Sequence, residues 1–212
     1  TNNILEFMQL RDVNKLLFAS SSSVYGNNKT IPFSETDDVS RSISPYAFTK
    51  RSCELMNYNY HHLYKIDVLN LRLFTVYGPR QRPDLAIHKF VRMISEGKAI
   101  TMYGDGTTAR DYTFVADTVD GFIKALDYIQ SHDRVYDIIN LGNNQPVKLK
   151  DLINAIYMLM GEQPNIEQLP MQPGDVEITY ANIEKAKSIL GYNPGTDIQD
   201  GLRQFIEWYR AV

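Results

Sequence analysis

The alternation of short apolar runs with amphipathic stretches constrains the fold of this sequence more than any other feature. Four apolar runs indicate β-strands, at residues 15–19, 67–73, 99–103 and 136–141. The amphipathic stretches around them predict α-helices, at residues 3–12, 45–64, 84–97, 117–130, 148–160, 182–190 and 198–210. Strand–helix alternation of this kind is typical of an α/β protein built on a doubly wound parallel sheet.

The regularity of this alternation suggests two lobes. We expect residues 1–78, joined later by about 111–144, to form the doubly wound sheet and its helices. Residues 79–212 mix short strands and helices less regularly, which indicates a smaller α/β lobe. We expect that lobe to come mainly from residues 79–110 and 145–195.

Composition excludes several classes of function. The net charge of −3 gives no electrostatic reason to expect nucleic acid or an anionic membrane as a partner. Cys53 is the only cysteine, so no intrachain disulfide can form. No apolar run approaches the roughly 20 residues that span a bilayer, and the first residues do not resemble a signal peptide. We therefore expect a cytoplasmic location. The four histidines form no metal-ligand pattern.

The strongest chemical pattern combines a serine run with a tyrosine–lysine pair. Ser20–Ser23 follow the first predicted strand, and Tyr46 and Lys50 stand four apart on the next predicted helix, just after Pro45. Side chains four apart share a helix face. An ammonium group beside a phenol favours the phenolate, which can take a proton from a hydroxyl group. The serine run or the tyrosine–lysine pair alone could be an ordinary surface feature, but the two together favour a catalytic site.

These residues resemble a known family. The sequences LLFASSSSVYG and SPYAFTK are similar to the serine–tyrosine–lysine site of nucleotide-sugar epimerases and dehydratases, which belong to the extended short-chain dehydrogenases/reductases. Three later stretches match the family in order: LNLRLFTVYGPRQRPDLAIHKF, YGDGTTARDYTFV and MQPGDV. The resemblance implies a Rossmann-like sheet, NAD as cofactor and a UDP-sugar substrate. It also implies that Ser21, Tyr46 and Lys50 are catalytic and that Tyr46, Lys50 and Ser20 contact NAD.

Details of the motifs are most similar to UDP-glucuronate 4-epimerases. Related dehydratases and decarboxylases carry acidic residues where Ser22 or Ser23 stands, and glucose epimerases usually carry asparagine where Thr75 stands. The sequence Arg80-Gln81-Arg82-Pro83-Asp84 resembles the stretch whose second arginine meets the sugar carboxylate. A guanidinium group suits a carboxylate because it binds it through two hydrogen bonds. The alternative is a pair of solvated arginines in a loop.

The same resemblance implies further contacts with the UDP-sugar. The implied substrate-binding residues are Ser22, Ser23, Thr75, Arg80, Arg82, Lys89, Tyr103, Arg110 and Asp175. Arg110 would meet the pyrophosphate, Tyr103 the uracil and Asp175 the ribose. Each has a plainer alternative: a surface ion pair with Asp111, a core tyrosine and a turn residue.

One glycine motif is misleading. Residues 104–109 fit the pattern GxGxxA, but the following RDYTFV predicts a strand rather than the helix that a dinucleotide site requires. No other glycine cluster fits, so we expect most of the NAD site to be missing from these 212 residues. We also expect the isolated chain to bind NAD poorly, to be inactive and to aggregate.

Two alternative functions remain, and the sequence also predicts an oligomeric state. The rivals are a UDP-glucose or UDP-N-acetylglucosamine 4-epimerase, and a non-catalytic fragment that binds a UDP-sugar or nothing. The helices predicted at 3–12 and 45–64 resemble those that pair in family dimers, so we expect a homodimer. Met56, Tyr60 and Leu63 have the spacing of an apolar stripe, which could instead face its own sheet.

Overall fold

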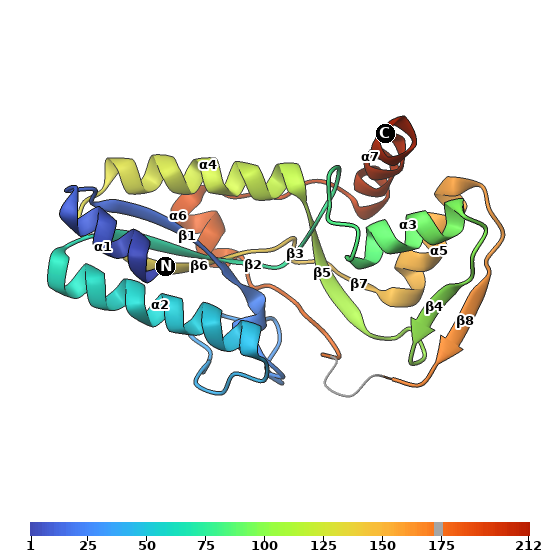
Figure 1. Cartoon of the computed structure of the whole chain (residues 1–212), viewed down its shortest axis with the longest axis horizontal. Helices are drawn as coiled ribbons and strands as arrows, with labels where there is room; N and C mark the ends of the chain where they lie inside the picture. Colours follow the sequence, from blue (N-terminus) through green and yellow to red (C-terminus); the bar gives the residue numbers. More distant parts are fainter. Residues whose placement is uncertain (172–175) are drawn as a thin grey trace.

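The predicted alternation produces a three-stranded parallel sheet in the computed structural model, which describes residues 1–171 and 176–212 (Figure 1). The sheet order is β1 (Lys15–Ser21), β2 (Asp67–Leu73) and β6 (Tyr136–Leu141). Central β2 is buried at nearly every position. This is expected of a parallel strand covered by helices on both faces, and the buried positions include the polar residues Asp67, Asn70 and Arg72.

Helices cover both faces of this sheet (Figure 1). One face carries α1 (Asn2–Leu10) and α2 (Pro45–Tyr64), and the other carries α4 (Val115–Ser131) and α6 (Glu184–Leu190). Helix α2 begins where its cap sequence predicts. The Ser44 side chain accepts a hydrogen bond of 3.1 Å from the Ala47 backbone N–H, and Pro45 occupies the first turn.

The other end of the molecule holds smaller sheets and three further helices (Figure 1). In one sheet, β3 (Thr75–Tyr77) runs parallel to β5 (Ala109–Phe114), and β5 runs antiparallel to β7 (Pro146–Lys148). In another, β4 (Ile100–Tyr103) runs parallel to β8 (Ile166–Leu169). The helices are α3 (Ala86–Ser95), α5 (Leu149–Met160) and α7 (Ile198–Ala211).

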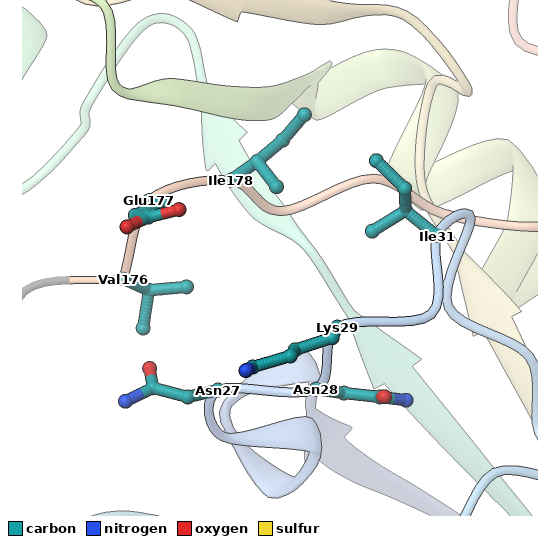
Figure 2. Close-up of a pocket in the computed structure, with 7 residues that line it drawn as sticks. All are labelled: Asn27, Asn28, Lys29, Ile31, Val176, Glu177 and Ile178. Carbon is teal, nitrogen blue, oxygen red and sulfur yellow. The ribbon is translucent and has the colours of Figure 1, made fainter.

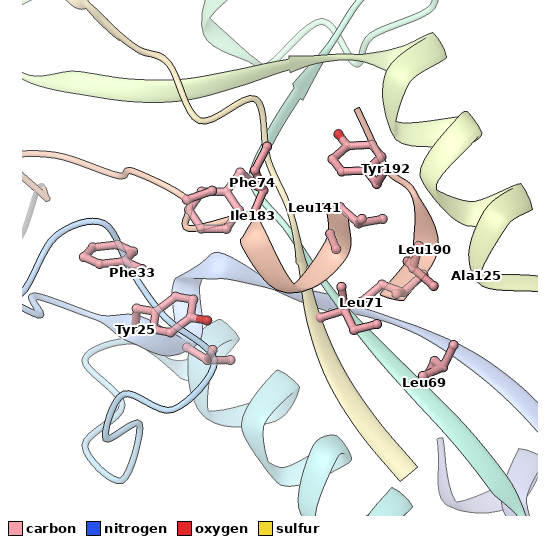
Figure 3. Packing of buried hydrophobic residues seen from close by; sticks show 14 of the residues in the cluster. Tyr25, Phe33, Leu69, Leu71, Phe74, Ala125, Leu141, Ile183, Leu190 and Tyr192 are labelled. Atoms are coloured by element: carbon pink, nitrogen blue, oxygen red, sulfur yellow. The ribbon is translucent and has the colours of Figure 1, made fainter. Parts of the chain in front are cut away.

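The buried apolar residues form separate clusters at the two ends. Figure 3 shows the cluster of the large sheet, where Leu69, Leu71 and Leu141 meet Leu190 and Tyr192. A second cluster joins α3, α5 and α7 to β3 and β5. The segment around α6 therefore packs with the large sheet, although we had expected residues 145–195 in the smaller lobe. Whether 1–78 and 79–212 behave as separate domains stays a prediction.

The boundaries of several elements differ from the sequence prediction. Strand β1 extends past Ala19, because Ser20 and Ser21 continue its register with Arg72 and Leu73. A 3₁₀ turn, η1 (Ser22–Tyr25), follows directly. Strands β3 and β7 were not predicted because three residues show no readable periodicity, and β8 was not predicted because its sequence IEQL has only two apolar residues. Within the described parts of the chain, no helix combines the length and apolar character needed to cross a membrane.

Candidate active site

The serine run lies at the carboxyl edge of the large sheet. Ser20 and Ser21 complete β1, and η1 then turns the chain over that edge. The Ser21 hydroxyl donates to the Ser23 hydroxyl at 3.1 Å and accepts from the Ser23 backbone N–H at 3.2 Å. Ligands of α/β proteins bind at this edge. Ser21, Ser22 and Ser23 are therefore in the place that the motif predicts.

The structure brings Tyr46 and Lys50 to the same edge. Lys50 Nζ donates to the backbone oxygen of Ala19 at 2.8 Å, and it lies 5.8 Å from the centre of the Tyr46 ring. It also lies 5.3 Å from the Phe18 ring centre. The Tyr46 side chain is 54% exposed, so its phenol is accessible. An accessible phenol and a neighbouring ammonium group at the end of a parallel strand fit the nicotinamide end of NAD.

Ser20 points elsewhere than the cofactor assignment implies. Its hydroxyl donates to Glu54 Oε1 at 2.6 Å, and both side chains are buried. This hydrogen bond counts against a direct contact between the Ser20 hydroxyl and NAD. It places Ser20 in a polar network beneath the site, which the sequence analysis did not identify.

That network is centred on a buried ion pair between α2 and β2. Arg72 donates to both oxygens of Glu54, each at 2.9 Å, and its guanidinium carbon lies 4.8 Å from the Tyr25 ring centre. Burial acts to raise the pKa of Glu54, but the hydrogen bonds and charge of Arg72, with help from Ser20 and Arg51, lower it below its usual value. Because Glu54 is one turn beyond Lys50, the ion pair fixes the helix that carries Tyr46 and Lys50 against the sheet.

Several predicted substrate residues meet in one cavity of about 240 Å³. Strands β3 and β5 pair side by side and bring Thr75 and Arg110 to the serines Ser22 and Ser23. The other lining residues are Gly26, Ile43, Ser44, Val176 and Thr179. The cavity therefore joins the serine end of the catalytic motif to the arginine predicted to bind phosphate.

Two larger cavities lie beside the segment that follows Asp175. One, of about 550 Å³, separates the loop at residues 27–31 from Val176, Glu177 and Ile178 (Figure 2). The other, of about 540 Å³, lies over the turn at residues 104–109 and also contacts Glu177 and Ile178. Residues 176–179 thus contribute to the walls of all three cavities.

Four other predicted residues do not line these cavities. Arg82 is exposed and pairs with Asp84 at 3.0 Å, and Arg80 and Lys89 are also exposed. Tyr103 is half-buried at the end of β4. Asp175, assigned to the ribose, lies outside the described residues. In residues 1–171 and 176–212, no group of three or more histidine, cysteine, aspartate or glutamate side chains is placed to hold a metal ion.

The rejected glycine motif is a turn between strands. Residues 104–109 lead into β5, so no helix follows them. Gly104 and Gly106 have φ values of +73° and +74°, which favour glycine. A Cβ atom on Gly106 would lie 2.8 Å from Met102 Sδ and 2.9 Å from Lys150 Cβ, so close packing also requires glycine there. The exclusion of this motif as a dinucleotide site is consistent with the fold.

Comparison with known proteins identifies the family. Residues 1–142 match the NAD dependent epimerase/dehydratase family, and the chain belongs to it. It is 48% identical to an uncharacterized protein, MJ1055, of Methanocaldococcus jannaschii over 99% of this chain and 63% of that protein. It is 41% identical to a UDP-glucuronate 4-epimerase of Thermodesulfobacterium geofontis, over 98% of this chain and 63% of the relative.

A solved structure agrees with these sequence matches. The UDP-glucuronic acid 4-epimerase of Bacillus cereus, in complex with UDP-glucuronic acid and NAD, superposes with a TM-score of 0.91 at 34% identity. The match covers 98% of this chain and 65% of that one. The chain therefore spans somewhat less than two thirds of the length of these relatives.

Proposed function

We propose that the protein is an NAD-dependent 4-epimerase of UDP-sugars, with UDP-glucuronate as substrate and UDP-galacturonate as product. The observation that carries this proposal is the placement of Lys50, beside Tyr46, against the end of β1, where the next serines, Ser22 and Ser23, line the cavity that Arg110 also lines. The end of β1 thus links the pair assigned to proton transfer with a cavity that holds a cation suited to phosphate. The names of the similar proteins support the same activity.

The chemistry needs one base that works in both directions. Tyr46 and Lys50 would hold the nicotinamide end of bound NAD, which would supply the hydride chemistry at C4 of the sugar. Tyr46 takes the proton of the 4-hydroxyl group as the ketone forms, and gives it back when the alcohol re-forms. Lys50 holds the cofactor ribose and favours the phenolate, while Ser21 orients the hydroxyl group and then the ketone oxygen. The sugar turns over between the two steps.

The substrate assignment concerns the sugar carboxylate. The 4-keto form of glucuronate is a β-keto acid, which readily loses CO2. Ser22 and Ser23 offer no acid for that side reaction, and Arg82 would hold the carboxylate in place. Arg110 would bind the pyrophosphate and Tyr103 the uracil, with Lys89, Arg80 and Asp175 as further contacts.

One observation favours a rival substrate. Arg82 pairs with Asp84 at the surface and does not line the 240 Å³ cavity. If Arg82 kept Asp84 as its partner in the complex, it would not bind the sugar carboxylate. The substrate would then be a neutral UDP-sugar, UDP-glucose or UDP-N-acetylglucosamine. A protein that binds UDP-sugars without turning them over is the third candidate.

The test separates these candidates by product and by competition. The 212-residue chain, and a form with the glycine-rich segment of a relative placed before Thr1, are incubated with NAD and UDP-glucuronate, and the UDP-galacturonate formed is measured by chromatography. Competition with UDP-glucose then ranks the sugars. Turnover of UDP-glucose alone would support the neutral-sugar epimerase. Binding of both NAD and UDP-glucuronate without turnover would overturn the epimerase assignment.

A further inference from the structure

Asp111 holds an unusual position for a charged residue next to the predicted phosphate-binding arginine. Its side chain is fully buried in β5. The carboxylate accepts hydrogen bonds from three backbone N–H groups: Asn143 at 2.6 Å, Asn144 at 3.0 Å and Ala181 at 3.0 Å. A surface ion pair with Asp111 is the plainer alternative to the phosphate role that the sequence predicts for Arg110. The carboxylate instead joins two chain segments far from β5 in sequence.

One of these segments, which we call the strap, comprises residues 176–181. It lies against the start of β5: the Ala109 N–H donates to Glu177 O at 2.9 Å, and the Thr179 N–H donates to Ala109 O at 3.1 Å. The Thr179 hydroxyl also accepts from the Asp111 backbone N–H at 3.1 Å. Asp111 therefore holds the strap through both its backbone and its side chain.

The contacts of the strap explain why its position matters. Val176 and Thr179 line the 240 Å³ cavity, and Glu177 and Ile178 line both larger cavities. On its far side, the Phe33 backbone N–H donates to Tyr180 O at 2.7 Å, which ties the strap to the loop after η1. A shift of the strap would therefore change all three cavities.

The chemistry at residue 111 requires a carboxylate. Burial holds the pKa of Asp111 above its usual value, and the three N–H donors partly offset that shift because they stabilise the ionised form. Two carboxylate oxygens can accept all three bonds, whereas an asparagine would turn its NH2 group toward one or more N–H groups. The strap also needs space: a Cβ atom on Gly142 would overlap Ala181 Cβ and lie 3.2 Å from Asp111 Oδ2.

We propose that Asp111 is a positioning residue for the UDP-sugar, because it fixes the strap that walls the three cavities. The role rests on the proposed function for its substrate. Asp111 and Arg110 are consecutive in β5, so their side chains leave opposite faces of the strand. Anchoring one side chain in the interior directs the other to the cavity that it lines. Strand β5 thus both anchors the strap and carries Arg110, which lines the cavity.

The test uses Asp111→Asn and the milder Thr179→Val, with Asp120→Asn as matched control. Asp120 lies on α4 and pairs with Lys124 at the surface. Hydrogen exchange at the amides of Thr179, Ala181 and Asn143 reports on the anchoring. Calorimetry with UDP and with UDP-glucuronate reports on the site. Because one lost hydrogen bond is worth up to about tenfold in an equilibrium, we expect roughly tenfold faster exchange and up to about tenfold weaker binding in Asp111→Asn.

The other variants and the kinetics complete the design. Thr179→Val should change exchange in the same direction by a smaller factor and should fold even if Asp111→Asn does not. Asp120→Asn should match the wild type in both measurements. In an active form, Asp111→Asn should raise KM for the UDP-sugar and leave kcat near normal, since the groups that move the proton are untouched.

The outcomes separate the inference from the proposed function. Unchanged strap exchange in both Asp111→Asn and Thr179→Val would overturn the anchoring. Faster exchange with unchanged nucleotide affinity would overturn the positioning role. Failure of the wild type to bind either UDP or UDP-glucuronate would overturn the proposed function, and with it the substrate role of Asp111, whatever the exchange shows.

Discussion

The start of α2 and the loop at residues 79–85 are held in opposite ways. Tyr46 and Lys50 stand on a long helix whose Glu54 is clamped to Arg72 inside the protein. Arg82 stands on an irregular loop and pairs only with its neighbour Asp84, with 73% of its side chain exposed. The groups assigned to chemistry are thus fixed by the sheet, whereas the group assigned to sugar specificity is fixed by a loop.

The loop nevertheless has a firm backbone. Gln81 donates from its side chain to Val76 O at 3.1 Å, and His88 Nδ1 donates to Gln81 O at 2.6 Å. The His88 ring is surrounded by aromatic side chains of α7, with ring centres 5.5 Å away at Phe205 and 5.8 Å away at Trp208. Gln81 is therefore held, while the arginines on either side of it extend into solvent and can change partners when a ligand binds.

The largest expected effect is on turnover, and it tests the role assigned to Tyr46 on α2. Tyr46→Phe removes only the hydroxyl group that moves the proton, so epimerisation should fall by roughly 10²–10⁴-fold while UDP-glucuronate affinity stays near normal. Turnover is measured in a form that binds NAD, and affinity by calorimetry. Tyr58→Phe, on the same helix but three turns further along, is the control and should keep wild-type turnover. Near-normal turnover by Tyr46→Phe would remove Tyr46 from the mechanism.

The next effect tests the support beneath the helix. Glu54→Gln leaves Arg72 buried without its counter-ion, which should cost about 3–5 kcal/mol of unfolding free energy. The double variant Glu54→Leu with Arg72→Met should recover part of that loss, because no charge then remains buried. Urea unfolding measures each value. Glu96→Gln, which breaks an exposed pair with Lys98, serves as control and should change little.

The unfolding free energy that Glu54→Gln loses relative to the wild type should also depend on pH. The pKa of Glu54 is lowered in the folded state, so its ion pair contributes stability above the ordinary glutamate pKa of 4.5. That contribution should disappear as the pH falls through the lowered folded value. The difference between wild type and Glu54→Gln should therefore shrink on acidification. A difference that is the same at pH 7 and under strongly acidic conditions would contradict the ionised pair.

The third prediction tests whether Arg82, on the loop at residues 79–85, determines which sugar is bound. Arg82→Ala should weaken UDP-glucuronate by roughly ten- to a hundredfold, the value of a charge-assisted hydrogen bond, and UDP-glucose far less. Arg203→Ala removes a similar exposed arginine, paired with Asp200, and should affect neither sugar. Competition assays with both sugars give the ratio. Equal losses would mean that Arg82 does not read the carboxylate, and Arg80 would be the next candidate.

The sequence predicts the regular parts of this molecule and the motif they carry. The strands of the large sheet, the cap of α2 and the meeting of Ser22, Thr75 and Arg110 all follow from local pattern or from the family resemblance. Strand β8 does not, because its short sequence IEQL has two polar residues between its apolar ends and gives no apolar run.

The buried charges were missed for a different reason. Asp111 looks like a surface partner for Arg110 in sequence, and only the return of the strap, 70 residues later, buries it. A signal for the other pair was present: Arg72 stands between Leu71 and Leu73 in a predicted strand, and a charge in such a place needs a partner. Which residue that is depends on how α2 packs, and the sequence pattern does not specify it.

The smallest expected effect concerns assembly, and it compares α2 with α4. Of the predicted stripe on α2, Met56 and Tyr60 pack against the molecule's own core, beside Leu5 and Met8, so only Leu63 remains exposed. For these two residues the alternative of packing on the home sheet is correct. A different set of large apolar side chains is exposed on α1 and α2: Ile4, Phe7, Leu10, Phe48, Leu55 and Tyr58.

We propose that this second set forms the face through which two copies pair. Phe48 and Leu55 are seven residues apart and therefore share one side of the helix. Losing part of a buried leucine costs about 1–2 kcal/mol, so Leu55→Ala should weaken a symmetric dimer roughly tenfold for each copy that carries it. Ile123→Ala, at an exposed position of α4, is the matched control and should leave association unchanged. Light scattering over a concentration series measures both variants. A wild type that stays monomeric at high concentration would rule out the dimer, and equal weakening by both variants would place the interface elsewhere.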